Sequence, residues 1–148
     1  MQNSEIKSIA IALLADISNG DVAGIAAKLT EDAVWITPSD PRVFKFAGTH
    51  SRQEFLDVMQ LFTGFFSQKL TFTALVATCE GNRVALEAEA RGVAQQIPFF
   101  NRYHFLFEFR GNRIAVAKEY MDSAFAVWFN AEITRRTATS ADSILAPG

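Results

Sequence analysis

The stretch from Asn101 to Asp122, NRYHFLFEFRGNRIAVAKEYMD, predicts two strands joined by a tight turn. Aromatic side chains alternate with mostly polar ones along its first half, which is the period-two pattern of a strand with two unlike faces. Gly111-Asn112 marks the turn, because both residues tolerate the positive φ of tight hairpin turns. β-branched and aromatic residues favour a second strand from Ile114 onward. The stretch therefore predicts an antiparallel hairpin.

The turn leaves two ways of pairing these strands open. A two-residue turn places His104 opposite Glu119. A turn with a G1-type bulge instead places Tyr103 opposite Glu119. Phe105 then faces Ala117. We favour this second register, because it packs large rings against small alanines on one face of the sheet and leaves the charged residues on the other.

Glu119 is the first candidate for chemistry. In either register it lies on a sheet face among apolar neighbours, where loss of water raises the pKa of a carboxyl group. A residue with a shifted pKa is a candidate general base. Tyr103 is the second candidate, because its hydroxyl can hydrogen-bond Glu119 or a ligand oxygen. Each residue also has a purely structural interpretation. Glu119 could be one partner of an ion pair across the sheet, and Tyr103 could be a ring of the core.

Composition and charge narrow the possible function classes. The chain has 148 residues, which suits one domain of ordinary size. Its net charge is -2 with acids and bases intermixed, so we expect no nucleic-acid partner. The single cysteine, Cys79, excludes a cysteine metal cluster. No apolar run approaches the ~18 residues of a membrane span and no leader pattern opens the chain, so we expect a cytoplasmic protein.

Periodicity and turn signals place helices mainly before strands. Ser51 with Glu54 three residues later fits the capping box that opens a helix. The segment 95–100, which contains a proline, is expected to be a connecting loop. The expected helices cover 4–19, 21–29 and 51–66, and the expected strands cover 33–37, 70–79, 83–93 and the two arms of the hairpin.

This order of elements indicates an α+β fold rather than a parallel α/β sheet. Three N-terminal helices packed on a strongly curved, mainly antiparallel sheet would enclose a conical pocket. Past Asp122 the chain allows a short helix. We divide the whole chain into one domain over 1–130 and a polar, mobile C-terminal tail over 131–148.

Several motifs, taken in order, resemble those of a known family. They are GD after the first helix, LTEDAVWITP, GTHSRQEF opening the third helix, and the closing pattern NxYxFxF…IxxxKEYxD. From about Ser4 to Phe129 the sequence resembles the SnoaL-like branch of the NTF2-like superfamily, which includes ketosteroid isomerases, limonene epoxide hydrolases and polyketide cyclases. The resemblance implies a cone-shaped α+β fold and often a homodimer packed through the sheet. It implies little about the reaction, because one fold hosts many sites.

The resemblance allows the family's functional positions to be compared one at a time. Glu119 matches the acidic residue that serves as base in the epoxide hydrolases and cyclases. Thr37 stands where the isomerases place their base, so steroid isomerisation by the family mechanism is not expected. Trp35 and Thr37 stand where the epoxide hydrolases hold their water, so half of that clamp is missing. Glu89 with Arg91 matches their arginine–carboxylate pair only if the alignment shifts by one residue.

The remaining candidates for ligand contact are mostly apolar. Trp35 is expected in the pocket wall, where its N–H needs a partner. Asn101, near the wide end of the cone, is a candidate to orient a ligand. The position of the cyclases' histidine falls at Phe105 in the favoured register, and His104 replaces that histidine in the other register. The predicted binding set is Trp35, Thr37, Phe55, Met59, Phe62, Glu89, Asn101, Phe105 and Ala117.

Two functions of different class follow from these residues. The first is an enzyme that binds a small apolar or aromatic molecule carrying a carbonyl, hydroxyl or epoxide. Glu119 would act as general base and Tyr103 as polar partner, in an isomerisation, cyclisation or hydration. No cofactor or metal is expected, because the chain has no phosphate loop or nucleotide fingerprint. The second is a non-catalytic ligand-binding or dimerisation module, which the incomplete catalytic sets favour.

Overall fold

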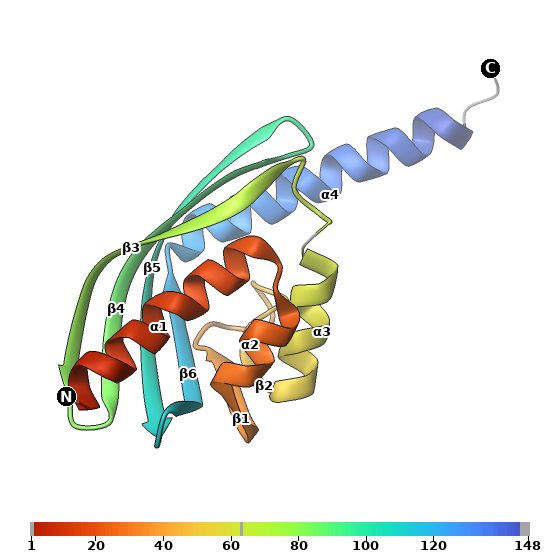
Figure 1. Cartoon of the computed structure of the whole chain (residues 1–148). Coiled ribbons are helices and arrows are strands. Elements are labelled where there is room, and N and C mark those ends of the chain that lie inside the picture. Colours follow the sequence, from red (N-terminus) through yellow and green to blue (C-terminus); the bar gives the residue numbers. More distant parts are fainter. Residues whose placement is uncertain (1, 63, 146–148) are drawn as a thin grey trace.

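The computed structural model describes residues 2–62 and 64–145, and side chains as far as residue 138. Four helices and six strands form one α+β unit (Figure 1). The helices are α1 (Gln2–Asn19), α2 (Val22–Lys28), α3 (Arg52–Phe62) and α4 (Ser123–Leu145). The strands are β1 (Leu29–Thr37), β2 (Gly48–Ser51), β3 (Gln68–Glu80), β4 (Arg83–Ala94), β5 (Ile97–Arg110) and β6 (Arg113–Met121).

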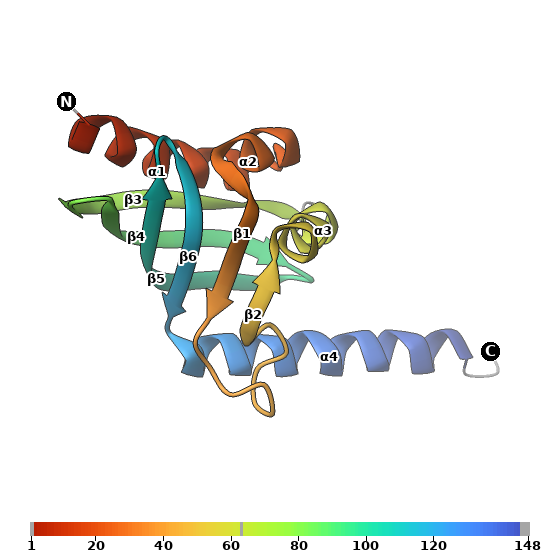
Figure 2. The same ribbon diagram turned by 90° about the horizontal axis from the view of Figure 1, so that it is seen from below.

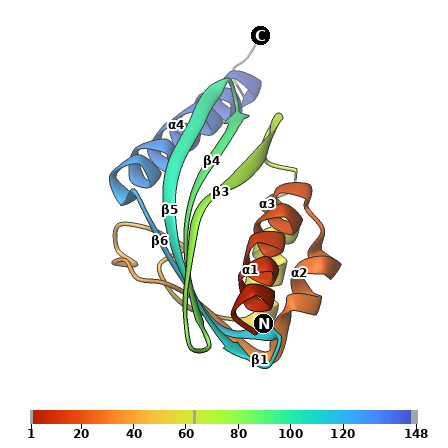
Figure 3. The same cartoon turned by 60° about the vertical axis from the view of Figure 1, so that its left-hand side comes forward.

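The strands form a single curved sheet in the order β2-β1-β6-β5-β4-β3. Only β1 and β6 run parallel, and every other neighbouring pair is antiparallel. Helices α1, α2 and α3 cover the concave face of the sheet (Figure 3). Helix α4 crosses beyond the ends of β6 and β1 (Figure 2). The predicted α+β architecture, with helices packed on a strongly curved sheet, is confirmed, and the sheet is open rather than closed.

The β5–β6 hairpin follows neither predicted register over its whole length. It begins with a two-residue turn over Gly111 and Asn112, and a bulge at Ala115 then shifts the pairing. As a result Phe105, rather than Tyr103 or His104, lies opposite Glu119. The predicted faces are right, because the extra residue returns the rings to the side of Glu119.

One connection differs from the predicted loop, and the start of one helix agrees with the prediction. Ser51 and Glu54 exchange the two hydrogen bonds of a capping box, at 3.2 and 3.1 Å, as predicted. The segment expected to be a loop over 95–100 contains a tight turn instead. Gln95 and Gln96 have φ of 48° and 65°, and β5 starts at the next residue. Glutamine is an uncommon residue at positive φ, so the sequence carried no signal for this turn.

Helix α4 runs much farther than the sequence predicts. The segment 131–148, expected to be a polar tail, is helical as far as Leu145. It has neither glycine nor proline before Pro147, and Arg136 donates a hydrogen bond of 2.7 Å to the carbonyl of Gln95. Both features favour continuation of the helix. Within the described residues, no helix combines the length and apolar character that crossing a membrane requires.

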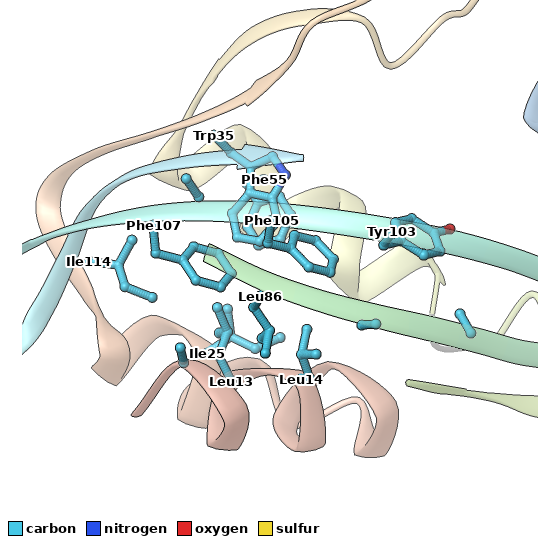
Figure 4. Close-up of a cluster of buried hydrophobic side chains, with 14 of the residues drawn as sticks. Leu13, Leu14, Ile25, Trp35, Phe55, Leu86, Tyr103, Phe105, Phe107 and Ile114 are labelled. Carbon is cyan, nitrogen blue, oxygen red and sulfur yellow. The ribbon is translucent and has the colours of Figure 1, made fainter. Parts of the chain in front are cut away.

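The core lies between the sheet and the three N-terminal helices (Figure 4). Phe105 and Phe107 of β5 are fully buried and stack on one another with ring centroids 5.5 Å apart. Leu13 and Leu14 of α1 pack onto the same cluster from the opposite layer. Burying such side chains contributes roughly 1.5–3 kcal/mol each. This core fixes the inward face of β5 and β6 that carries the candidate residues.

Gly92 of β4 is a position where a side chain would not fit. An added Cβ would lie 3.0 Å from the Gln68 carbonyl oxygen and 3.1 Å from the Leu70 Cα. We expect Gly92→Ala to lower the free energy of unfolding by about 1–3 kcal/mol, because backbone atoms cannot move aside cheaply. Urea denaturation measures this loss. Gly64→Ala is the matched control, since its Cβ would contact nothing within 4 Å. Equal stability of the two variants would contradict the expectation.

Candidate functional site

The candidate site is built around the Glu119 carboxylate on β6. Its neighbours come from β1, which pairs with β6 in parallel and aligns Trp35 with Ala117. Trp35 Nε1 and Thr37 Oγ1 each donate to Glu119 Oε2 at 3.3 Å. Both donors are neutral, and among the described residues no lysine or arginine forms an ion pair with this carboxylate. Glu119 is therefore held in place without being neutralised.

Burial raises the pKa of Glu119 above its usual range, and it is the largest influence on this group. The hydrogen bonds from Trp35 and Thr37 act in the opposite direction, as does the nearby His50. The residue nevertheless keeps part of its surface accessible. A carboxyl group with a raised pKa is a stronger base once it is ionised, which is the property that proton transfer requires.

The two carboxylate oxygens of Glu119 have different surroundings. Oε2 accepts the hydrogen bonds of Trp35 and Thr37, whereas Oε1 accepts none from the described part of the chain. Oε1 is also absent from the buried, partnerless polar atoms of that part, so a water molecule can touch it. One oxygen is thus fixed and the other is free, an arrangement that allows Oε1 to accept a proton from a bound molecule.

Tyr103 provides a second polar group on the same face of the sheet. It lies opposite Met121 and is therefore the diagonal neighbour of Glu119, which is opposite Phe105. Its ring is buried, and Figure 4 shows its oxygen pointing away from the ring cluster. Burial and the charge of Glu119 both raise the pKa of Tyr103 well above its usual range. Its hydroxyl therefore stays protonated and can serve as a hydrogen-bond donor.

Asn101 lies two residues before Tyr103 on β5, and backbone groups hold its side chain in place. Its Oδ1 accepts from the backbone N–H of Arg102 at 2.8 Å, and its Nδ2 donates to the carbonyl of Asp122 at 3.3 Å. Asn101 also lowers the pKa of the Tyr103 hydroxyl in part, against the larger effects of burial and of Glu119.

Aromatic and apolar side chains form the wall of the site. Trp35 stacks on Phe55 of α3 with ring centroids 3.8 Å apart and meets Phe105 edge-on at 6.3 Å. Met59 packs against the same core one turn along α3 from Phe55. Phe62, at the end of α3, contacts Phe46 and Phe66 rather than Trp35. The wall therefore extends from Glu119 along α3 toward α4.

The structure brings most of the predicted residues together, with one clear exception. Glu89 lies on the outer face of β4, because Ala88 and Ala90 on either side of it are buried. It faces Arg91 at 3.9 Å instead of Glu119. The arginine–carboxylate pair considered from the resemblance is therefore outside the site. The strict alternation of a β-strand accounts for this placement.

His50 is a neighbour of the site that the sequence did not indicate. It lies directly opposite Trp35 in the β1–β2 pair, so both side chains are on the inner face of the sheet. His50 lies between the predicted strand over 33–37 and the helix predicted from Ser51, so no predicted element assigns it a face. In the structure every second residue from Gly48 to Ser51 is half-buried, but the sequence Gly-Thr-His-Ser has no apolar alternation that would have indicated this strand.

Comparison with known proteins agrees with this architecture. A model of the SnoaL-like domain matches residues 10–117. The chain belongs to the SnoaL-like family. No curated protein matches this SnoaL-like chain in sequence.

Solved structures with the same fold are numerous and distant in sequence. PrhC from Penicillium brasilianum is 14% identical, with a TM-score of 0.81 over 97% of each chain. The BvnE pinacolase from Penicillium brevicompactum is 16% identical, with a TM-score of 0.79 over 95% of this chain and 99% of BvnE. A protein with a ketosteroid isomerase-like fold from Catenulispora acidiphila is 17% identical, with a TM-score of 0.64 over 76% and 83% of the two chains. These likenesses show the NTF2-like fold that the sequence predicts.

Helix α4 lies beyond the range that the family model matches. PrhC and BvnE cover so much of this chain that most of α4 must be aligned with them. The likeness to these two structures therefore extends past the matched range into α4.

Proposed function

We propose that this SnoaL-like protein catalyses proton transfer on a small, largely apolar molecule that carries one carbonyl, hydroxyl or epoxide group. The observation that carries the proposal is the state of Glu119. Its carboxylate is surrounded by protein, is held by two neutral donors at one oxygen and is free at the other. A carboxylate kept only for structure is usually paired with a cation when buried, and no cation pairs with this one among the described residues.

The residues suggest a division of roles. Glu119 Oε1 would accept a proton from the carbon next to a ligand carbonyl, and the electron pair of that C–H bond would form an enolate. The enolate oxygen would accept a hydrogen bond from Tyr103, which stabilises developing negative charge. Return of the proton to another carbon completes an isomerisation. With an epoxide, Glu119 would instead deprotonate a water molecule that attacks a ring carbon. The C–O bond at that carbon would break, and the released oxygen would take a proton from solvent to give the diol.

The wall of the site supports an apolar ligand. Trp35 donates to the carboxylate, Phe105 lies opposite Glu119 in the sheet, and Phe55 stacks on Trp35. These rings offer stacking and dispersion but no charge. Surroundings that are mostly apolar, with a few placed polar groups, are typical of small-molecule sites. One structural relative, BvnE, is named a pinacolase, so the same fold carries a rearrangement of a small molecule in that protein.

Hydrogen–deuterium exchange tests the proposal without knowledge of the natural substrate. Cyclic ketones from cyclohexanone to decalone would be incubated with the protein in D2O, and loss of the α-proton signal followed by NMR. Limonene oxide and cyclohexene oxide would be tested in parallel for diol formation. Exchange or opening above the buffer rate, and lost with Glu119→Gln, supports the proposal. Tight binding of these ligands with no turnover would contradict it.

Tyr103→Phe tests the role of the hydroxyl. We expect kcat/KM to fall by about 10- to 100-fold, a loss of roughly 1.4–2.7 kcal/mol of transition-state stabilisation. The melting temperature should change little, because the phenylalanine ring still contacts Phe72 at the position of the tyrosine ring. Tyr120→Phe, which removes an exposed hydroxyl, is the matched control. Unchanged turnover in Tyr103→Phe would assign Tyr103 to the core alone.

Ligand capture without chemistry is the second candidate function. The observation in its favour is that Thr37 occupies the position of the isomerases' base and donates a hydrogen bond to Glu119. In that case ligands would bind equally well to wild type and Glu119→Gln, and neither would turn them over. The exchange experiment separates these two functions directly.

We also propose that the protein forms a homodimer through the outer face of the sheet. Leu75, Val76 and Tyr120 are 48%, 56% and 46% exposed on this face. A shallow hollow of about 270 Å³ between β4, β5 and β6 adds relief that a second copy could fill. Exposed apolar side chains of this kind are typical of interfaces. Sedimentation equilibrium would show a dimer that Val76→Arg converts to a monomer.

A further inference from the structure

Strand β2 contributes one side chain to the inner face of the sheet, and it is His50. Thr49 and Ser51 are exposed, and Gly48 has no side chain. Gly48 pairs with Thr37 and His50 with Trp35, the two residues that donate to Glu119. His50 therefore lies beside Trp35 of β1, and Trp35 in turn donates to the Glu119 carboxylate.

The imidazole of His50 is hydrogen-bonded at Nε2 and faces a carboxylate at Nδ1. Nε2 lies 2.9 Å from the carbonyl oxygen of Phe46 and must donate, because a carbonyl can only accept. Nδ1 lies 3.7 Å from Glu54 Oε2. The other oxygen of Glu54 accepts from the backbone N–H of Ser51 in the capping box, so this carboxylate is itself held in place. The ring therefore lies between a carbonyl oxygen and a carboxylate, both of which are acceptors for a ring N–H.

The charged groups around His50 come from two elements. Glu54 belongs to α3 and Glu119 to β6, and both are acidic. Glu54 is 64% exposed at its side chain, so solvent weakens its attraction for the ring. Glu119 is far less accessible, and the charge of His50 favours its ionised form.

We propose that His50 is a positioning residue for Glu119, in which the imidazolium held by Phe46 and Glu54 stabilises the anionic base across Trp35. The proposal rests on the proposed function for its meaning in catalysis. The electrostatic coupling between His50 and Glu119 that it states does not depend on the proposed function. The same ring also fastens the 38–47 loop, whose Phe44 and Ala47 pack against Ala126 of α4.

Carbon-detected NMR titration of protein labelled at the glutamate carboxyl carbons tests the coupling, with Glu119→Gln used to assign the signal. His50→Gln keeps a side-chain donor for the Phe46 carbonyl but removes the charge, and we expect it to raise the pKa of Glu119. His50→Lys restores a positive charge and should return the pKa of Glu119 toward the wild-type value. An unchanged Glu119 titration in His50→Gln would overturn the proposal.

Two further variants separate charge from structure. Glu54→Gln keeps a capping-box residue but removes the anion that faces the ring, so it should weaken the effect of His50 and raise the pKa of Glu119 slightly. Asp57→Asn removes an exposed carboxylate from the same helix and should leave Glu119 unchanged. If Asp57→Asn shifts Glu119 as much as Glu54→Gln does, the effect comes from general charge and the proposal is wrong.

Activity provides a second readout that is independent of the titration. In acidic solution, where imidazole rings are charged, His50→Gln should lower kcat/KM by about two- to fivefold, which is the range of a single partly exposed charge interaction. His50→Lys should recover this loss. Failure of all variants, including wild type, to turn over ketones would reject the proposed function and leave the titration result standing. If kcat/KM falls equally in His50→Gln and His50→Lys, the charge of His50 has no role in the reaction.

Discussion

Glu119→Gln is expected to lower kcat by about 10²- to 10⁴-fold, the contribution that a positioned general base usually makes. Glutamine has nearly the same shape and can still accept from Trp35 and Thr37, so the surrounding geometry is preserved. It cannot accept a proton from carbon or water. KM should therefore change little while kcat falls, and single-turnover and steady-state rates measured on the same ketone or epoxide would show this split.

The stability of Glu119→Gln provides a control, because this variant should gain stability although it loses activity. Because the pKa of Glu119 is raised in the folded chain, the folded state retains this proton to higher pH than the unfolded state does. Stability therefore falls as pH rises from about 4.3, the ordinary glutamate value, through the raised folded value, and is constant above it. Glutamine has no such proton. The variant should gain stability relative to wild type as the pH rises from about 4.3 to the raised pKa of Glu119 in the folded state.

These two results test different statements about Glu119. Lost turnover together with gained stability at neutral pH identifies a residue kept for chemistry at a cost to the fold. A variant that loses both turnover and stability would show that Glu119 is a structural acceptor for Trp35 and Thr37. A variant that keeps full turnover would move the base to another residue.

The fold was predictable from the sequence because local signals agree with the global arrangement. Gly111-Asn112, the capping box at Ser51 and the ring alternation from Tyr103 each specify one element, and together they require helices packed on an antiparallel sheet. The face of Glu119 was predictable for the same reason. The alternation of side chains along a strand sets the face on which each residue lies, even where a bulge changes its partner on the next strand. The bulge at Ala115 is an example, because it changes the partner of Glu119 but not its face.

The features that the sequence did not predict share a physical cause, because each of them depends on contacts with residues far away in the sequence. Gln95 and Gln96 form a tight turn only because β4 and β5 pair along their full lengths on either side of it. Helix α4 extends because Phe129 and Arg136 find partners on other elements. The position of His50 depends on β2 pairing with β1. None of these contacts leaves a periodic pattern in its own segment, so local reasoning cannot detect them.

Phe105→Ala is expected to reduce the free energy of unfolding by about 3–5 kcal/mol, the usual cost of truncating a buried phenylalanine. The Phe105 side chain is 1% exposed and contacts rings on both sides, with centroids 5.6 Å from Tyr103 and 5.5 Å from Phe107. Its loss would remove dispersion contacts and leave a cavity in the middle of β5. A domain of this size has about 5–15 kcal/mol to lose, so the variant should be markedly less stable but measurable.

Urea denaturation of three variants would isolate the packing term. Phe105→Leu conserves more volume and should cost less than about 1.5 kcal/mol. Leu61→Ala removes a side chain that is 78% exposed and should stay within about 0.5 kcal/mol of wild type. The midpoint should fall with an unchanged slope, since the surface exposed on unfolding is nearly constant. A cost below 1 kcal/mol for Phe105→Ala, by the same cavity rule, would mean that the core refills the site.

Phe105 also links packing to the chemistry of the site, because it lies directly opposite Glu119. Removing the ring would admit water beside the carboxylate and reduce the burial that dominates its pKa. The pKa of Glu119 should therefore fall toward its ordinary value in Phe105→Ala, whereas His50→Gln should raise it. Opposite shifts from two neighbours of the same carboxylate would show that its basicity is set by desolvation and charge together. A rise in both variants would mean that Phe105 acts through the hydrogen bonds of Trp35 and Thr37 instead.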